Sequence, residues 1–454
     1  MDLPHQTEFK AVDYGARPDG VTCSTLGIQA AVDAAFARGG GRVTFEKGIY
    51  LTGAIFVKSN VEFFIDAGVE IRGIQDETAY PDIWSRVAGV EMNWPSGLVN
   101  IIEAHQVKIS GSGIIDGQGE YWWDKYWGAD KLGGMRKAYT ARGLRWAVDY
   151  DCKRPRNVIV LNSSEVGLEN FTSIRSPFWN VHICYSDRVW VDGVVVKDNL
   201  GPSTDGIDID SSTRVWVENC DIDCNDDNVC VKSGRDADGL RVNKPAEKII
   251  IRNCRIRHGE GITLGSETSG GIHDVEIDHI KAYGSHNGLR FKSSRTRGGL
   301  IENITVHDLE FINVAYPFSF QLDWNPSYSY ATIPENWRDS VPDHWKVLAQ
   351  PVEPPERGIP EFKKINIFNV TAKCGKGSNE ERRIPSRAFD VYAYAQKPIH
   401  QVCWKNIMVE AERAGSIANA RDWMMENVVL RTTVNEPLKL ENCHNVQLPK
   451  VEFI

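Results

Sequence analysis

The sequence lacks the features of several protein classes. No run of apolar residues approaches the ~20 that a membrane-spanning helix needs. The start, MDLPHQTEF, has no basic stretch followed by an apolar core, so it is not a signal peptide. Positive charge is not in excess, since 52 Lys and Arg stand against 61 Asp and Glu, giving a net charge of −9. This argues against a nucleic-acid partner, because neutralising phosphates requires a basic face.

Cellular location is left open by these absences. Either a signal peptide has been removed from a secreted or periplasmic protein, or the protein is cytoplasmic. The ten cysteines show no paired CxxC spacing of the kind typical of zinc sites. Three of them, Cys220, Cys254 and Cys443, occupy repeat positions that elsewhere hold Ile, Leu or Val. Buried free thiols are therefore favoured over disulfides at these positions.

A six-residue pattern, apolar-x-apolar-x-x-apolar, recurs along the chain. Alternate apolar residues predict strands with one buried face, and no helical periodicity accompanies the repeat. Such repeats predict a solenoid of parallel strands, an all-β parallel β-helix in which each coil buries its face on its neighbours. Asn often fills the turn slot, because it tolerates unusual backbone angles. The copies begin at Val166, Val189, Val215, Ile249, Val275, Ile304, Ile365 and Val402, with closer copies at Trp423 and Leu438, and the turn residues are Asn170, Asn219, Asn253 and Asn369.

A second register lies in the other half of each coil. Four segments align without gaps: DGIDIDSS from Asp205, DNVCVKSG from Asp227, EGITLGSE from Glu260 and NGLRFKSS from Asn287. Equivalent residues should stack about one strand spacing (~4.8 Å) apart.

One domain over residues 1–454 is expected, with a short helix covering its N-terminal end. The segment TLGIQAAVDAAFARGGG carries Ile28, Val32, Ala35 and Phe36 on one helical face, which suits a cap on an exposed coil edge. Two segments interrupt the repeat, at about 74–155 and 323–360. The first is rich in tryptophan, and we interpret both as loop excursions that flank a site.

Carboxylates and cations gather in the second register. Asp205 and Asp227 share one position on consecutive coils, and Asp226 is adjacent to Asp227. Like charges this close resist joint ionisation, which suits the acid and base of glycoside hydrolysis. Arg290 and Lys292 alternate with apolar residues and face one side, where they could bind a carboxylated sugar. A solvated strand face is the plainer interpretation of either group alone.

Five motifs resemble glycoside hydrolase family 28, the polygalacturonases: SPFW from Ser176, STDGIDIDSS from Ser203, CNDDNVCVKSG from Cys224, GEGITLGSE from Gly259 and GLRFKSSRTRGG from Gly288. The opening segments VDYGARPDG and YLTGAIFVKSNVEF are also similar to the family, so the likeness covers nearly the whole chain. The resemblance implies a right-handed parallel β-helix and inversion at the anomeric carbon, with no metal and no cofactor.

Site residues follow from the resemblance position by position. Asp226 takes the role of general acid, and Asp205 and Asp227 hold and deprotonate the attacking water. Arg290 and Lys292 correspond to the family's Arg-x-Lys. For an inverting enzyme we expect the carboxyl of Asp226 to lie ~6.5–9.5 Å from the water-binding pair.

Two positions depart from the family. Ser203 replaces the usual Asn, and Glu260 stands where relatives carry the His of Gly-His-Gly; His258 could substitute only if the turn is rebuilt. The register places Glu260 beside Asp227, where it either supports the acid's proton or accepts a bond from a substrate hydroxyl. We favour the second role. The GSE tripeptide and the aromatic excursion resemble exo-acting or specialised members. We expect the excursion at 74–155 to close one end of the groove, with its tryptophans stacked on sugar faces.

The expected function is hydrolysis of an acidic plant cell-wall polysaccharide containing galacturonic acid, with exo action. A rhamnogalacturonan-type hydrolase is an alternative. A pectate lyase-like enzyme would share the fold, and a non-catalytic glycan-binding β-helix is a third possibility. The stacked acids argue against simple binding, because a carboxylate cluster repels an acidic glycan unless it performs chemistry. The oligomeric state is not set by the sequence.

Overall fold

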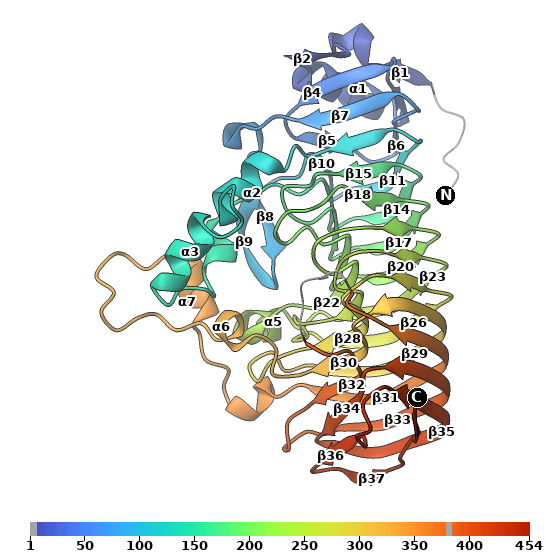
Figure 1. Ribbon diagram of the computed structural model, residues 1–454. Helices are drawn as coiled ribbons and strands as arrows, with labels where there is room; N and C mark the ends of the chain where they lie inside the picture. Colours follow the sequence, from blue (N-terminus) through green and yellow to red (C-terminus); the bar gives the residue numbers. More distant parts are fainter. Residues whose placement is uncertain (1–6, 378–383) are drawn as a thin grey trace. The chain divides into compact units, whose positions relative to one another are not determined.

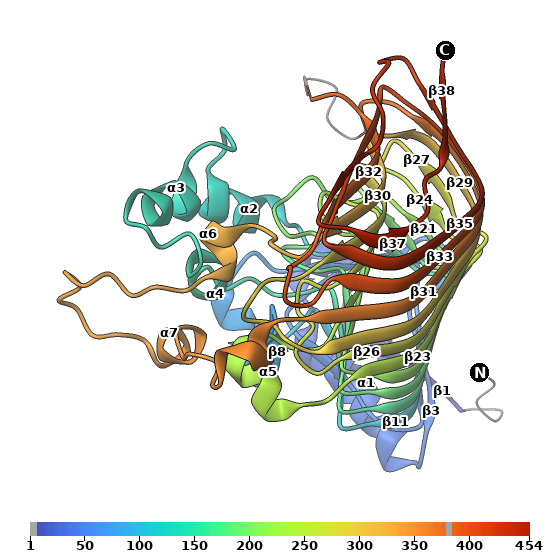
Figure 2. The same cartoon turned by 90° about the horizontal axis from the view of Figure 1, so that it is seen from below.

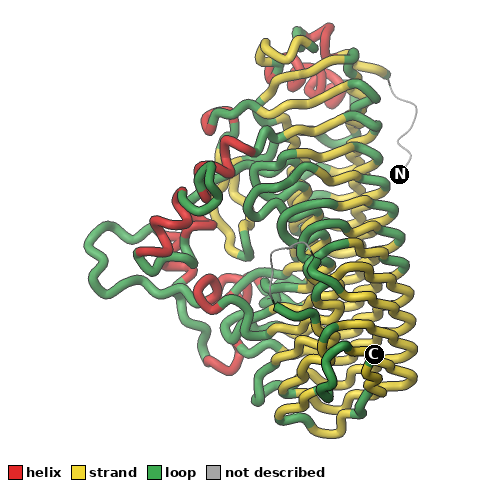
Figure 3. Tube along the Cα trace, viewed as in Figure 1, coloured by secondary structure: helices red, strands yellow, loops and turns green. Residues whose placement is uncertain are grey.

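The computed structural model describes residues 7–377 and 384–454. The chain forms two compact units. The first comprises Met1–Val87, Glu91–Arg142 and Val148–Asp226, and the second comprises Ala88–Val90, Gly143–Ala147 and Asp227–Ile454. Strands dominate both units, and the helices lie mostly in the connecting excursions (Figure 3). The expected all-β parallel β-helix is confirmed. No helix in the described ranges is long and apolar enough to cross a membrane.

The first unit is a stack of three-sided coils (Figure 1). One side consists of β5 (Ile55–Val57), β10 (Val99–Ile102), β13 (Val158–Leu161), β16 (Val181–Cys184) and β19 (Ile207–Asp210), paired in parallel in that order. The second side consists of β1 (Glu8–Lys10), β3 (Gly41–Thr44), β6 (Val61–Phe64), β11 (His105–Ser110), β14 (Ser164–Glu169), β17 (Asp187–Asp192) and β20 (Thr213–Glu218). The third consists of β2 (Asp19–Cys23), β4 (Gly48–Thr52), β7 (Val69–Gly73), β12 (Ile114–Asp116), β15 (Thr172–Ile174), β18 (Val195–Lys197) and β21 (Asp221–Ile222).

The second unit repeats this plan with longer strands. One side consists of β22 (Val229–Lys232), β25 (Ile262–Leu264), β28 (Asn287–Lys292), β30 (Tyr316–Gln321), β32 (Arg387–Tyr392), β34 (Arg413–Ala418) and β36 (Lys439–Glu441). The opposite strands are β23 (Ala246–Arg252), β24 (Arg255–Ile256), β26 (Ile272–Asp278), β27 (Lys281–Tyr283), β29 (Leu300–Val314), β31 (Glu361–Cys374), β33 (Ile399–Ala411), β35 (Ala420–Thr432), β37 (His444–Val446) and β38 (Lys450–Phe453). Figure 2 shows β31, β33 and β35 side by side, as their parallel pairing requires.

The predicted interior ladder is confirmed within each unit. In the first, Val166 pairs with Val189, which pairs with Val215. In the second, the strand register aligns Ile249, Val275 and Ile304 in the same way. All six side chains are buried. Apolar residues at alternate strand positions therefore stack coil on coil, and this burial is the main source of stability in a solenoid.

The turn asparagines behave as their slot predicts. The four residues Asn170, Asn219, Asn253 and Asn369 have φ between 53° and 64°, the left-handed region that Asn tolerates better than most residues. The repeat-position cysteines carry free thiols, of which Cys220 and Cys254 are buried and Cys443 is partly exposed. The predicted free thiols are confirmed at all three positions, but the predicted burial is wrong for Cys443.

Helix α1 (Thr25–Ala37) caps the first coils and packs on β1, β3, β5 and β6. Its buried face includes Ile28, Val32 and Ala35, as expected. Phe36 is wrongly assigned to that face, since it is 45% exposed. It lies instead under the ammonium of Lys58, 5.3 Å from the ring centre, a cation–π contact at the surface.

The excursion expected at 74–155 is not one continuous loop. Residues 99–116 inside it form β10, β11 and β12, which are ordinary coil strands. Before them come η2 (Glu77–Ala79), β8 (Asp82–Val87) and β9 (Val90–Pro95); after them come α2 (Glu120–Trp127), α3 (Gly134–Ala141) and α4 (Val148–Asp151). The apolar-x-apolar pattern is short in this coil and is surrounded by aromatic residues. For this reason residues 99–116 were not recognised as part of the repeat.

The second excursion, 323–360, is confirmed as a break between β30 and β31. It contains α6 (Pro326–Ser329), α7 (Asp343–Leu348) and η3 (Pro355–Gly358), and its described residues contribute no strand. The remaining short elements are η1 (Ala11–Tyr14) and α5 (Asp236–Val242).

Most tryptophans of the first excursion belong to its interior, contrary to the expectation that they stack on sugars. The side chains of Trp94, Trp122, Trp123 and Trp146 are at most 7% exposed, whereas Trp84 is 62% exposed. Long loops need a small core of their own, and aromatic residues supply much buried area per residue. Their abundance here reflects packing.

Candidate active site

Asp205 lies in the turn that leads into β19 and is buried. The turn is held by the hydroxyl of Thr204, which donates to the carbonyl oxygens of Asn199 (3.1 Å) and Gly201 (2.9 Å). Ser203 has φ 54°, a left-handed conformation that Asn adopts more readily than Ser. Ser203 thus adopts the left-handed backbone conformation of this turn without an Asn side chain.

Asp226 ends the first unit and is half-buried. Its nearest carboxylate oxygen lies within 4.8 Å of the nearest one of Asp205. Because this bound applies to the nearest oxygens and not to the centres of the carboxyl groups, the separation of ~6.5–9.5 Å expected of an inverting pair stays a prediction.

Asp227 begins the second unit and is completely buried among hydrogen-bond donors. The hydroxyl of Thr263 donates to its Oδ1 at 2.7 Å, and the Nζ of Lys292 donates to its Oδ2 at 2.6 Å. Two further cations are close: a guanidinium nitrogen of Arg290 at 3.6 Å and the Nζ of Lys232 at 4.0 Å. The structure thus gathers Asp227, Arg290 and Lys292 as expected.

The cations decide the charge state of Asp227. Burial alone would raise the pKa of Asp227, but Lys292, Lys232 and Arg290 outweigh it and hold the pKa well below its usual range. Burial likewise favours neutral Lys292, yet the carboxylate of Asp227 raises the pKa of this lysine. The ionised form of Asp227 is therefore favoured, which is the form that a group must have to deprotonate water.

Glu260 lies beside this cluster, where the gapless register places it. Its Oε2 accepts hydrogen bonds from Nδ2 of Asn287 (2.7 Å) and from the guanidinium of Arg290 (2.9 Å). The turn is fixed by Gly261, whose φ is +81° and where a Cβ would lie 2.2 Å from the carbonyl oxygen of Asn287. With the turn fixed in this way, the carboxylate of Glu260 holds Arg290 in place through the hydrogen bond to Oε2.

His258 does not take the place of the missing family histidine in this structure. Its side chain is exposed, and its carbonyl oxygen accepts a bond from Nδ2 of Asn228 (2.7 Å). The Oδ1 of Asn228 accepts the backbone N–H of Gly261 (2.8 Å), so one amide clamps both ends of the turn. His258 is not among the residues that line the recess beside Glu260 and Arg290.

Four residues of this cluster were missed in the sequence. Lys232 and Thr263 contact Asp227, and buried Glu267 lies 3.5 Å from Lys232 through Oε2. Trp324, from the second excursion, lies with its ring centre 4.5 Å from the Nζ of Lys292, a cation–π contact. The register could have shown Lys232 and Thr263, since they align with Lys292 and Arg290 on other coils. No feature of the sequence around Trp324 indicated that this residue contacts Lys292.

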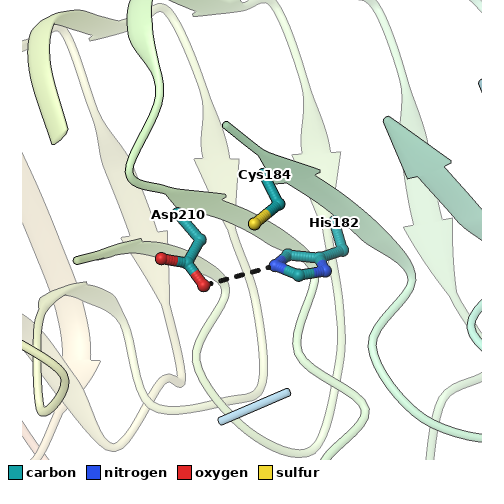
Figure 4. Close-up of side chains that lie close together, drawn as sticks. All are labelled: His182, Cys184 and Asp210. Atoms are coloured by element: carbon teal, nitrogen blue, oxygen red, sulfur yellow. Dashed lines mark ion pairs between the residues drawn. The ribbon is translucent and has the colours of Figure 1, made fainter. Parts of the chain in front are cut away.

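A second polar cluster lies in the first unit, where His182 and Cys184 of β16 face Asp210 of β19 (Figure 4). Arg86 donates to Oδ1 of Asp210 at 2.9 Å, and a guanidinium nitrogen of Arg156 lies 2.6 Å from Nδ1 of His182. A guanidinium only donates, so Nδ1 accepts and the neutral ring carries its proton on Nε2, 3.6 Å from Asp210. A nitrogen that bears a proton cannot bind a metal ion. The cluster is better explained as the anchor for two buried arginines.

Comparison with known proteins identifies the family. The model described as "Glycosyl hydrolases family 28" matches residues 56–334, more than half of the chain. The chain belongs to this family. A "Probable polygalacturonase" of Vitis vinifera is 30% identical over 402 residues, covering 84% of this chain and 76% of that protein. The "Exo-poly-alpha-D-galacturonosidase" of Dickeya chrysanthemi is 25% identical, covering 95% of this chain and 73% of that protein.

Among solved structures, a hyperthermoactive exopolygalacturonase from Thermotoga maritima is similar, with a TM-score of 0.73 and 26% identity over 90% of this chain and 89% of that one. The family 28 resemblance drawn from the motifs is thus confirmed, and with it the right-handed parallel β-helix. The chain is a glycoside hydrolase of family 28. The lyase, rhamnogalacturonan and pure binding alternatives are not favoured by these findings.

Proposed function

We propose that this family 28 enzyme hydrolyses the α-linked bonds of galacturonan, with Asp226 as general acid and with Asp205 and Asp227 as the groups that hold and deprotonate water. The observation that carries the proposal is the environment of Asp227. Three cations keep this carboxylate ionised. Glycoside hydrolysis requires one ionised carboxylate of this kind together with a second carboxyl group that donates a proton, the role we propose for Asp226.

Arg290 and Lys292 would bind the carboxylate of a galacturonic acid unit. One guanidinium nitrogen of Arg290 contacts both Glu260 and Asp227, which fixes the position of this cation. Lys292 has three N–H donors, of which one is directed at Asp227. A substrate carboxylate beside them would meet a charged, largely water-excluded surface, where charge-assisted hydrogen bonds are strong.

Exo action and inversion are proposed on the likeness to the family. Both the Dickeya relative and the Thermotoga structure carry exo-acting names. An exo-enzyme releases one small product from the start and lowers polymer viscosity little. Viscometry of polygalacturonate, combined with product sizing, tests this mode of attack; rapid viscosity loss with a ladder of intermediate oligomers would instead show endo action.

We place the enzyme outside the cytoplasm, secreted or periplasmic, because a pectic polymer cannot enter the cell intact. Six of the ten free cysteines are buried, which protects thiols from oxidation in such a compartment. Cell fractionation followed by immunodetection of the mature chain tests this location.

Hydrolysis itself is tested with purified chain and polygalacturonate. We expect new reducing ends without the ultraviolet absorbance of unsaturated, lyase-type products. Asp226→Asn should lower kcat by at least about 10³-fold, because removal of a general acid also removes the assistance it gives to the leaving group. A matched control is Asp192→Asn, the same change at the exposed last residue of β17. Equal activity of both variants would refute the assignment of Asp226.

A further inference from the structure

Two recesses adjoin each other on the strand face of the second unit. The first is bordered by Glu260 and Arg290 at one end and by Arg387 and Asp390 at the other. The second shares Arg387 with the first and continues to Arg413, Glu436 and Lys439. Together they run from the coil beside Asp227 towards the C-terminal coils of the unit.

The strand register arranges the cations of these recesses in order. Strands β28, β30, β32, β34 and β36 pair in parallel one after another. Arg387 is the direct register partner of Arg413, and Lys439 pairs with Ser416 on the next coil. Adjacent coils are ~4.8 Å apart. Arg387 and Arg413 thus stack on adjacent coils in the column of Asn287 and Tyr316, beside the column that leads from Arg290 through Asp390 to Lys439.

Arg387 and Arg413 each form an ion pair with an acidic residue, and this ion pair occupies only part of the hydrogen-bonding capacity of the arginine. Arg387 donates to Oδ1 of Asp390 at 3.1 Å, while Gln321 occupies Oδ2 at 2.7 Å. Arg413 donates to Glu436 at 3.0 Å. The arginine side chains remain 33% and 43% exposed, and a guanidinium has five N–H donors. Both partly exposed guanidinium groups therefore keep donors beyond those used in these ion pairs.

Such a surface fits a linear polymer that carries one carboxylate on every sugar. The arginines can donate to the carboxylates in a fork geometry, and the paired acids can accept bonds from sugar hydroxyls. Aromatic support is present as well, since the guanidinium of Arg387 lies 5.5 Å from the ring centre of Tyr316. A neutral glycan would offer these arginines only uncharged acceptors, which form weaker hydrogen bonds than carboxylates do.

We propose that Arg387 and Arg413 form a binding track for the part of the galacturonan chain that extends from the cleavage site over the C-terminal coils. This inference rests on the proposed function for the identity of the polymer. It assigns to these two arginines a role in length-dependent affinity and none in the chemical step.

The test measures binding without turnover. In the full-length Asp226→Asn enzyme, affinity for oligogalacturonates from the dimer to the octamer is measured by calorimetry. We expect affinity to rise with length in this parent and the rise to shrink by about tenfold or more when Arg387→Gln and Arg413→Gln are added, because charge-assisted contacts are lost. Digalacturonate affinity should stay unchanged. Arg387→Lys, which keeps the charge, should restore part of the rise.

Arg431→Gln is the matched control. Arg431 lies on β35 with ion pairs to Glu452 (3.1 Å) and Glu410 (3.5 Å), and it lines neither recess. Octamers with methyl-esterified carboxyls should bind the parent no better than the dimer does. The track is refuted if parent affinity does not rise with length, if the double variant weakens dimer and octamer equally, or if Arg431→Gln has the same effect. Hydrolysis by the unmodified enzyme is scored separately, so failure of the proposed function remains distinguishable from failure of the track.

Discussion

The Nζ of Lys292 lies 2.6 Å from Oδ2 of Asp227, and both side chains are buried. The pKa of the aspartate is lowered and that of the lysine is raised by this pairing against the opposing effect of burial. The stabilisation linked to Asp227 is therefore present above its unfolded pKa of about 3.9 and is lost as pH falls through its lower folded value. The part linked to Lys292 is fully present below about pH 10 and is lost as pH rises through its higher folded value.

Lys292→Met should move the acid limb of the pH–activity profile to higher pH. Methionine is similar in length but carries no charge, so the pKa of Asp227 should rise by about one unit or more when its strongest stabilising partner is removed. Activity would then be lost at a higher pH as the solution is acidified. The profile of kcat/KM on a short oligogalacturonate checks this. Lys346→Met on exposed α7 removes an equal charge and should leave the profile in place; an unmoved profile in Lys292→Met would contradict the prediction.

Glu260→Gln should reduce kcat/KM by about tenfold, mainly through KM. Glutamine is close in size, but it loses the charge that holds Arg290 and weakens the acceptor offered to a substrate hydroxyl. Glu260→His, which restores the family's residue, provides the comparison. Kinetics over a pH series decide the role. A shift of the acid limb by a unit or more with constant KM would show an electrostatic role for Glu260, and no change in either variant would place Glu260 outside the site.

The first product should have inverted anomeric configuration. This follows from the likeness to the family, with Asp226 as general acid and Asp205 among the groups that deprotonate the attacking water. Proton NMR of the earliest product, recorded before mutarotation, gives the configuration. A retained anomer would mean that one of these aspartates acts as a nucleophile.

Ile304→Ala should lower the free energy of unfolding by about 2–5 kcal/mol, since its side chain is fully buried in the interior ladder. If residues 1–454 behave as one domain, as we propose, calorimetry will show a single transition that moves as a whole. Met424→Ala, at a 57% exposed position, should change stability little. Two transitions, of which only one shifts in Ile304→Ala, would establish two independently folding domains.

The repeat was predictable because it depends on local alternation. Val166, Val189 and Val215 must share one interior face once the strand period of two is combined with a regular coil length. The same reasoning aligned Glu260 with Asp227 and brought Arg290 and Lys292 to one side. It was less successful where aromatic residues surround a short coil, as at 99–116, because loop packing there obscures the pattern.

The sequence by itself determined the parallel β-helix, its family and the clustering of acids with cations, since register follows from the order of apolar residues. Only the tertiary structure decided what surrounds each charge. It placed Lys232 and Thr263 against Asp227, brought Trp324 from a distant excursion onto Lys292, and buried the tryptophans expected to face sugar. These contacts depend on the path of long loops and on side-chain burial. Neither has a period along the chain from which it could be deduced.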